Sequence, residues 1–225
     1  LTDGAIERHG EDLKNAIKDA PTHVFSLLTR LRQACCDVGL LPWRTQLPPS
    51  GAKGDLLLEK LSDLYTSGAK VIVFSQFTSF LGILRKNIAL KLPELQILEL
   101  TGTTRDRSLP VETFESSKGP AVMLASLKAA GLGVTLKSAD YVFLMDPWWN
   151  PAAEEQAIDR AHRLGRVKPT FIYRLVAQGT IEERVRNLQL EKKETFRKII
   201  GEIDKSSGLT DHFTSLKELI ELKEN

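Results

Sequence analysis

Cysteines and long apolar runs are both scarce in this sequence. No run of about 18 apolar residues offers a membrane span, and no signal peptide opens the chain. The only cysteines, Cys35 and Cys36, are neighbours. A disulfide between neighbours strains the intervening peptide, and two cysteines without the spacing of metal ligands do not make a zinc site. We therefore expect an intracellular protein, cytoplasmic or nucleoid-associated in a prokaryote and nuclear in a eukaryote.

Two nucleotide-binding patterns are also missing. The sequence contains no Gly-x-x-x-x-Gly-Lys-Ser/Thr loop to cradle β- and γ-phosphates, and no Asp-Glu-x-His box to hold Mg²⁺. The chain begins at Leu1 without a methionine, which we interpret as the start of a fragment of a longer protein. These features predict that the chain holds no complete ATP site.

The composition fits one globular domain with appendages. The chain has 225 residues, of which 42% are hydrophobic and 27% charged. Its net charge of +2 is only a weak indication of nucleic-acid binding. A surface that binds phosphates must therefore be local.

An alternation of helical and strand patterns begins at Lys53. Short apolar runs predict five buried strands, over residues 71–75, 96–100, 121–125, 141–145 and 171–176. Helical stretches separate them, although Pro110 interrupts the helix expected over 105–116 and residues 131–139 are short for a full helix. Repeated units of this kind predict an α/β fold with a parallel, twisted sheet and helices on both faces.

Helical patterns flank this region on both sides. We expect a loosely packed helix over 3–19 and a second one over 22–37, followed by an extended, proline-rich connector. The apolar side chains expected to face inward from the second helix are Val24, Leu27, Leu28 and Leu31. Thr180 and Glu183 form a capping box that opens a long charged helix to about residue 200. Its predicted packing face consists of Ile181, Val185, Leu188 and Leu190.

Polar and small residues follow four of the predicted strands. Since the carboxyl ends of parallel strands meet at one edge, we expect these residues to form a single ligand-binding rim. Hydroxyls, amides, a lysine and closely approachable glycine backbone suit a phosphate backbone. Each also has a bland explanation: a simple turn, tight packing, a solvated charge or a core tryptophan. The residues in question are Gln76, Thr103, Thr104, Ser126, Lys128, Gly131, Gly133 and Trp149.

A helix that starts after Asn150 carries a cationic face. Gln156, Arg160 and Arg163 recur at helical spacing, with Asn150 as a suitable N-cap and Gly165 as a suitable end. Arginine binds phosphate through two parallel hydrogen bonds and stabilises charge that grows during phosphoryl transfer. The alternative is a solvated face on which neighbouring charges pair weakly.

The run Gln-Ala-Ile-Asp-Arg-Ala-His-Arg-Leu-Gly over 156–165, preceded by Asp-Pro-Trp-Trp-Asn-Pro over 146–151, resembles motifs of Swi/Snf-type DNA translocases of helicase superfamily 2. The resemblance extends from about residue 27 to residue 190 and includes several motifs in the family's order. Two positions depart from the family pattern: Arg166 stands where glutamine is usual, and Ala130 where glycine is common.

The resemblance implies a RecA-like second motor lobe over 51–180, with a helical lead-in and connector over 1–50 and a C-terminal helical extension over 181–225. It implies that Gln156, Arg160 and Arg163 act in catalysis, and we assign the two arginines, with Gly131 and Gly133, to nucleotide binding. ATP and Mg²⁺ would be held mainly by an N-terminal lobe of the same full-length chain, and this chain would supply no metal ligand. The remaining rim residues would contact double-stranded DNA without reading its sequence: Gln76, Thr103, Thr104, Ser126, Lys128 and Trp149.

We expect the isolated chain to be a monomer and, because the phosphate loop and the Mg²⁺-binding box are missing, to have negligible ATPase activity. Two alternatives stay open. One is the second lobe of a strand-separating helicase that acts on DNA or RNA. The other is a non-catalytic RecA-like module that binds DNA or a protein.

Overall fold

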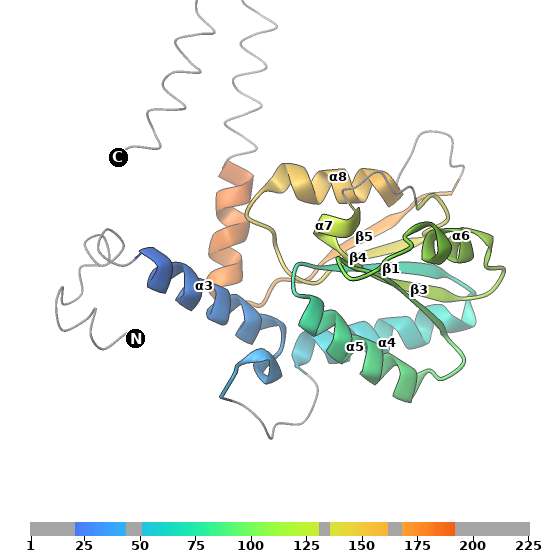
Figure 1. Cartoon of the computed structure of the whole chain (residues 1–225), viewed down its shortest axis with the longest axis horizontal. Helices are drawn as coiled ribbons and strands as arrows, with labels where there is room; N and C mark the ends of the chain where they lie inside the picture. Colours follow the sequence, from blue (N-terminus) through green and yellow to red (C-terminus); the bar gives the residue numbers. More distant parts are fainter. Residues whose placement is uncertain (1–20, 44–50, 131–135, 162–167, 192–225) are drawn as a thin grey trace, which may run out of the picture.

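A five-stranded parallel sheet forms the centre of the computed structural model, which describes residues 21–43, 51–130, 136–161 and 168–191 (Figure 1). The strand order is β2-β3-β1-β4-β5, and every neighbouring pair is parallel. The strands are β1 (Lys70–Ser75), β2 (Gln96–Leu100), β3 (Ala121–Ser126), β4 (Tyr141–Leu144) and β5 (Phe171–Arg174). The predicted α/β fold, RecA-like with a parallel sheet, is confirmed.

The five strands are not equally buried, contrary to the sequence prediction. Every residue of β3, and all of β1 except Lys70, is buried, because these two strands lie inside the sheet. β2 and β5 lie at its edges and are partly exposed. Phe171 and Tyr173 of β5 remain 50% and 43% exposed, although their rings stack on Tyr141 and Phe143 of β4. The apolar, aromatic pattern of residues 171–174 therefore predicted the strand β5 correctly but predicted its burial wrongly.

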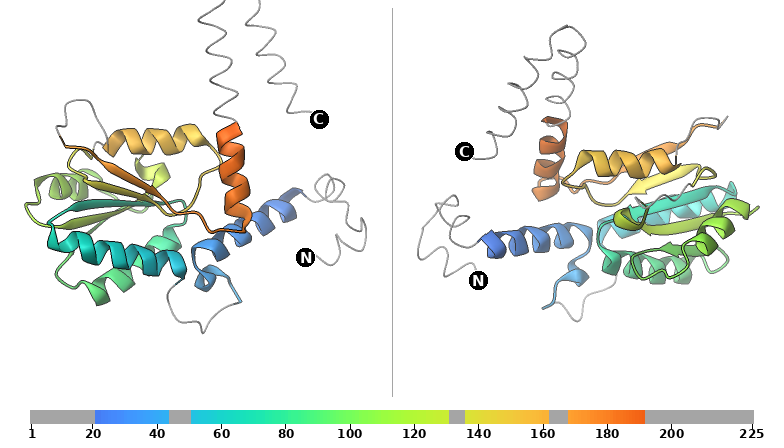
Figure 2. Two further views of the ribbon diagram at one scale, coloured as in Figure 1. Left: turned by 180° about the vertical axis from the view of Figure 1, so that it is seen from behind. Right: turned by 45° about the horizontal axis from the view of Figure 1, so that its top comes forward.

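Helices cover both faces of the sheet (Figures 1 and 2). α4 (Ala52–Thr66) and α5 (Thr78–Lys91) pack one core, in which Leu57, Leu61 and Phe80 are buried against the sheet. α6 (Ser108–Ser116), the single-turn α7 (Leu127–Ala130) and α8 (Pro151–Ala161) pack the other core. The two layers hold the sheet's carboxyl edge rigidly in place.

Local sequence signals explain where several elements begin and end. Gly68, with φ of 70°, lies just beyond α4 in the left-handed region that glycine adopts without strain. α6 begins only at Ser108 and accommodates Pro110 in its first turn. Asn150 accepts a hydrogen bond from Ala152 N at 3.1 Å, as expected of an N-cap.

The predicted capping box at Thr180 forms in altered geometry. The Thr180 hydroxyl accepts from the amide of Glu182 rather than from that of Glu183. The Glu183 carboxylate, in turn, accepts from the amide of Gly179. The two side chains therefore still satisfy exposed amides at the start of the helix that follows.

Two helices flank the sheet at its carboxyl edge: α3 (Pro21–Cys36) and the helix described over 181–191 (Figure 2). The predicted packing faces of both helices are partly wrong. Leu27 and Leu31 of α3 are 42% and 44% exposed, and Leu188 and Leu190 are 46% and 47% exposed. Val185 is buried as predicted, but the other inward positions of its helix are the polar Glu182 and Gln189, and α3 buries Arg32 together with Cys36.

The remaining flank predictions are only partly covered. A short 3₁₀ helix, η1 (Val38–Leu40), follows α3. The helix expected over 3–19, most of the connector and the chain beyond residue 191 lie outside the described residues, as does the side chain of Val24. In the part of the chain that is described, no helix is long and apolar enough to cross a membrane.

Candidate functional site

The carboxyl ends of β3, β1 and β4 lie side by side at one edge of the sheet. Ser75, the last residue of β1, pairs with Ser126 of β3, and Met145 N donates to Phe74 O at 2.9 Å. The segments that follow these strands carry Gln76, Lys128 and Trp149. The structure therefore places these three predicted rim residues at the same edge. Thr103 and Thr104 follow β2, which is paired to β3 further out.

Asp146 ties two of these segments together. Its carboxylate is 1% exposed, accepts from the Ser75 hydroxyl at 2.5 Å and from the side-chain amide of Gln76, and lies 3.3 Å from Gln76 N. Burial raises the pKa of Asp146, while its hydrogen bonds with Ser75 and Gln76 and the charge of Arg32 oppose that rise. Gln76 is thus held by Asp146 with its side chain half-buried at the rim.

The two tryptophans after β4 have different environments. Trp148 is half-buried and packs against the core on the α8 side. Trp149 is 41% exposed, and the Arg32 guanidinium lies 5.2 Å from its ring centroid. The core explanation therefore fits Trp148, whereas Trp149 is available at the surface.

The predicted phosphate-binding residues in the loops after β2 and β3 are three hydroxyl side chains and one lysine. Ser126 is 5% exposed, and its hydroxyl accepts from Ala129 N at 3.3 Å, so it acts mainly as a cap for α7. Lys128 is exposed. The Thr103 hydroxyl is exposed and lies 2.9 Å from that of Thr101, while Thr104 accepts from Thr101 N at 3.0 Å. Lys128 and Thr103 are therefore the more accessible phosphate-binding candidates of these four.

α8 presents its predicted polar side chains away from the core. Ala157 and Ala161 are buried against the sheet, while Gln156 is exposed and Arg160 half-buried. The carbonyl of Arg160 accepts from Leu136 N at 2.9 Å, which joins the end of α8 to the segment that leads into β4. Arg160 lies nine residues after the start of α8, about 14 Å along its axis.

Several predicted positions lie outside the described residues. These are Arg163, Gly165, Arg166, Gly131 and Gly133. The backbone of Ala130 belongs to α7, but the description does not extend to its side chain. Their predicted roles stay predictions.

Sequence reasoning missed a set of buried polar side chains beneath the rim. Lys53 of α4 is 6% exposed, and its Nζ donates to Met145 O at 2.6 Å and to Leu175 O at 3.1 Å. It also contacts both Glu182 oxygens, at 2.7 and 2.6 Å. Glu182 is 0% exposed and additionally accepts from Ala177 N at 2.8 Å. The helix over 181–191 is thereby fixed to the ends of β4 and β5.

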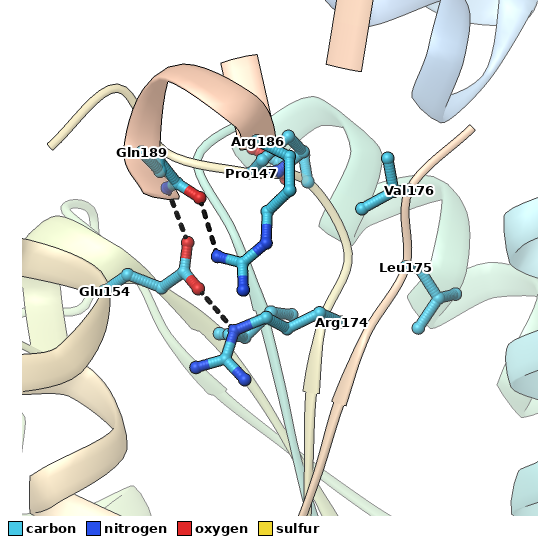
Figure 3. Close-up of a pocket in the computed structure, with 9 residues that line it drawn as sticks. Pro147, Glu154, Arg174, Leu175, Val176, Arg186 and Gln189 are labelled. Carbon is cyan, nitrogen blue, oxygen red and sulfur yellow. Dashed lines mark hydrogen bonds and ion pairs between the residues drawn. The ribbon is translucent and has the colours of Figure 1, made fainter. Parts of the chain in front are cut away.

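A second buried network joins the start of α8 to that same helix (Figure 3). Glu154 lies in the first turn of α8, where a carboxylate suits the helix dipole, and is 3% exposed. It accepts from Arg174 Nε at 2.7 Å and from Gln189 Nε2 at 3.0 Å. Arg186 Nη1 donates to Gln189 Oε1 at 2.9 Å. Glu154 therefore joins α8 to β5 and to the helix over 181–191, and a carboxylate in the first turn of a helix does not by itself predict such a role.

Small-molecule and metal sites are limited in the described residues. The pocket drawn in Figure 3, with about 190 Å³ of space including open solvent, is lined by Glu154, Arg174, Arg186 and their neighbours and is too small for a nucleotide. Across the described ranges, no group of three His, Cys, Asp or Glu side chains is placed to hold a metal ion.

Comparison with known proteins agrees with the fold and motif order. Residues 53–165 match the "Helicase conserved C-terminal domain" family. The chain is 34% identical over 206 residues to the uncharacterized ATP-dependent helicase MG018 of Mycoplasma genitalium, covering 89% of this chain and 19% of that protein. It is 40% identical to the DNA repair protein RAD5A of Arabidopsis thaliana, over 74% of this chain and 15% of that protein. The chain thus spans about a fifth or less of these relatives.

Among solved structures, the SWI2/SNF2 ATPase C-terminal domain of Sulfolobus solfataricus is similar with a TM-score of 0.66 and 26% sequence identity. The match covers 91% of this chain and 82% of that one. The family match, the relatives and the fold agree with the resemblance to Swi/Snf-type translocases seen in the motifs over 146–151 and 156–165. The chain therefore belongs to the Swi/Snf-type helicases of superfamily 2 and forms their C-terminal RecA-like lobe.

Proposed function

We propose that this chain is the second motor lobe of an ATP-dependent translocase that moves along double-stranded DNA. The observation that carries the proposal is the segment over 146–150. This segment follows β4 at the carboxyl edge of the sheet and exposes Trp149 there. It leads directly into α8, which carries Arg160. A movement of DNA against that edge is thereby linked through one short turn to the helix that carries Arg160.

Arg160 of α8 and Arg163 would act on a nucleotide that another lobe binds. A first lobe of the same protein would hold ATP and Mg²⁺, and closure of the two lobes would bring Arg160 and Arg163 to the γ-phosphate. Their planar, permanently charged groups would stabilise charge that builds up as the phosphoryl group leaves. Gln156 would assist on the same face, and Gly131 and Gly133 would allow close backbone approach. This chain alone would then hydrolyse ATP negligibly.

The polar edge would contact the sugar-phosphate backbone of DNA. Lys128 offers an exposed cation and Thr103 an exposed hydroxyl, while Gln76, Thr104 and Ser126 are more tightly held. Trp149 would pack against the duplex. Such contacts position a protein on DNA without reading bases, so binding should be independent of sequence and weaken with salt.

The experiment is an ATPase and strand-separation assay on the full-length protein. Duplex DNA of unrelated sequences should stimulate ATP hydrolysis to a similar degree, and no strand separation should accompany it. Separation of the duplex would favour a strand-separating helicase instead. An ATPase rate that does not respond to any nucleic acid would contradict the motor function altogether.

A further inference from the structure

Two successive carbonyls in the turn before Trp149 are held by buried side chains from two different helices. Arg32 of α3 donates from Nη2 to Pro147 O, and Gln189 of the helix over 181–191 donates from Nε2 to Trp148 O. Arg32 is 3% exposed and Gln189 1% exposed. Both lie outside residues 53–165, which match the helicase family, so the turn is held from both flanks of the matched region.

The Arg32 guanidinium makes a set of contacts centred on this turn. It lies 5.2 Å from the ring centroid of Trp149 and 5.8 Å from that of Phe77, which directly follows Gln76. Its Nη2 is 3.9 Å from Asp146 Oδ2. Arg32 therefore touches the segments after β1 and after β4, the same two that Asp146 joins.

The planar chemistry of arginine is needed for this arrangement. A guanidinium can lie over aromatic rings while its planar edge donates to a carbonyl, which the compact ammonium group of lysine matches less well. Burial lowers the pKa of Arg32, an effect that the charge of Asp146 opposes. Its Nε has no hydrogen-bond partner among the described residues. A buried charge with one unsatisfied donor is a poor way to stabilise a core, which an apolar side chain would do at lower cost.

Gln189 connects the other side of the turn to α8. Its Nε2 is shared between Trp148 O and Glu154 Oε2, the latter at 3.0 Å, while its Oε1 is held by Arg186. The orientation of the amide is therefore fixed from three directions. Since Glu154 lies in the first turn of α8, the same side chain holds the turn and the start of the arginine helix.

We propose that Arg32 and Gln189 are positioning residues that clamp the 146–149 turn from both sides and set the orientation of Trp149 at the DNA-facing edge. The inference rests on the proposed function for its consequence, since an oriented Trp149 matters if this edge meets DNA. The clamp itself is a property of this chain, and it can be tested without DNA or ATP.

The test uses the fluorescence of Trp149 in the 225-residue chain, with Trp43→Phe and Trp148→Phe removing the other two tryptophans. The clamp variants are Arg32→Lys, which keeps the charge but not the planar stack, and Gln189→Leu. Matched controls are Arg30→Lys, on the same helix and hydrogen-bonded to Gln33, and Gln178→Leu, an exposed glutamine. Thermal unfolding confirms that each variant is folded. If Arg32→Lys does not fold, the Gln189→Leu variant alone tests the proposal.

Quenching by acrylamide should rise roughly twofold in the clamp variants, because release of a ring that is 41% exposed can little more than double its accessible surface. The controls should match the parent. Quenching equal to the parent's in every folded clamp variant would overturn the proposal.

A second measurement separates the clamp from the proposed function. In the full-length protein, the same clamp variants should reduce the stimulation of ATPase by duplex DNA about threefold or more. If duplex DNA fails to stimulate even the parent protein, the proposed function falls, and the quenching result alone still decides the clamp. If stimulation in the parent is normal and the clamp variants keep all of it, Trp149 is not positioned for DNA by these residues.

Discussion

Replacing Lys53 with methionine should destabilise the lobe strongly, because this lysine is the hub of the buried ion pair beneath the polar edge. Its ammonium group contacts two carbonyls and both oxygens of Glu182 at 2.6–3.1 Å. Methionine is similar in length and would fill much of the space. Among the described residues, the Glu182 carboxylate, 0% exposed, would then keep only the amide of Ala177 as a hydrogen-bond partner.

The expected size follows from what is left uncompensated. Removing one partner of a buried ion pair typically costs about 3–5 kcal/mol, since the remaining charge stays out of water. For a protein of this size each kcal/mol shifts the melting temperature by about 2–4 °C, so Lys53→Met should lower it by roughly 6–20 °C. Urea unfolding followed by circular dichroism measures the free energy directly.

Two comparisons make the assay specific. Lys60→Met changes a partly exposed lysine on the same helix, whose contacts with Glu59 and Asp63 are 3.9 Å long, and should cost no more than about 0.5 kcal/mol. Adding Glu182→Leu to Lys53→Met should recover about 1–3 kcal/mol relative to the sum of the single changes. A loss below about 1 kcal/mol for Lys53→Met would refute the hub role.

Three further outcomes follow from the exposure of individual side chains. Lys128→Ala should weaken binding of duplex DNA by the full-length protein and lower the slope of log affinity against log salt by about 1, whereas an unchanged slope would remove Lys128 from the phosphate contacts. Trp149→Ala should cost no more than about 1–2 kcal/mol of stability, because the ring is 41% exposed, and should reduce stimulation of ATPase by DNA; global unfolding would show that Trp149 is a core residue. Burial raises the pKa of the Cys36 thiol well above its usual range, so a thiol reagent at pH 8 should label the half-buried Cys35 and spare Cys36 until the chain unfolds; rapid labelling of both would contradict the packing of α3.

The sheet was predictable because each strand has a sequence pattern that is recognisable without its neighbours. β1 and β3 each contain a continuous apolar run, Val71 to Phe74 and Ala121 to Ala125, and short runs of this kind are typical of strands buried on both faces. Their lateral order is not local. Nothing in the runs at 96–100 and 171–176 reveals that β2 and β5 lie at the edges, so their exposure was predicted wrongly.

The flanking helices failed for a related reason. Apolar periodicity suggested that Leu27, Leu31 and Leu188 face the core, but those positions are exposed. Arg32, Glu182 and Gln189 point inward instead, because each forms hydrogen bonds or an ion pair with groups at the carboxyl edge of the sheet. A lone arginine at position 32 or glutamine at 189 carries no pattern that would reveal such a partner more than 40 residues away.

The sequence predicted the positions of the rim residues better than it predicted the buried side chains that hold them. Parallel topology alone brings the segments after β1, β3 and β4 to one edge, so the positions of Gln76, Lys128 and Trp149 followed from strand direction. That Asp146 holds Gln76, and that Glu154 is a buried junction, depended on side-chain geometry that spacing does not encode.

We propose that Arg160 and Arg163 act on ATP held by a first lobe. The most direct measurement is the DNA-stimulated ATPase rate of the full-length protein with Arg160→Ala and with Arg163→Ala. Arg85→Ala serves as the control, an exposed arginine of α5 paired with Glu99. Arg160→Ala and Arg163→Ala should each lower the rate about 10³-fold or more while leaving DNA binding largely intact, and Arg85→Ala should leave the rate unchanged. A fall of less than about tenfold in both Arg160→Ala and Arg163→Ala would contradict a role of these arginines in ATP hydrolysis.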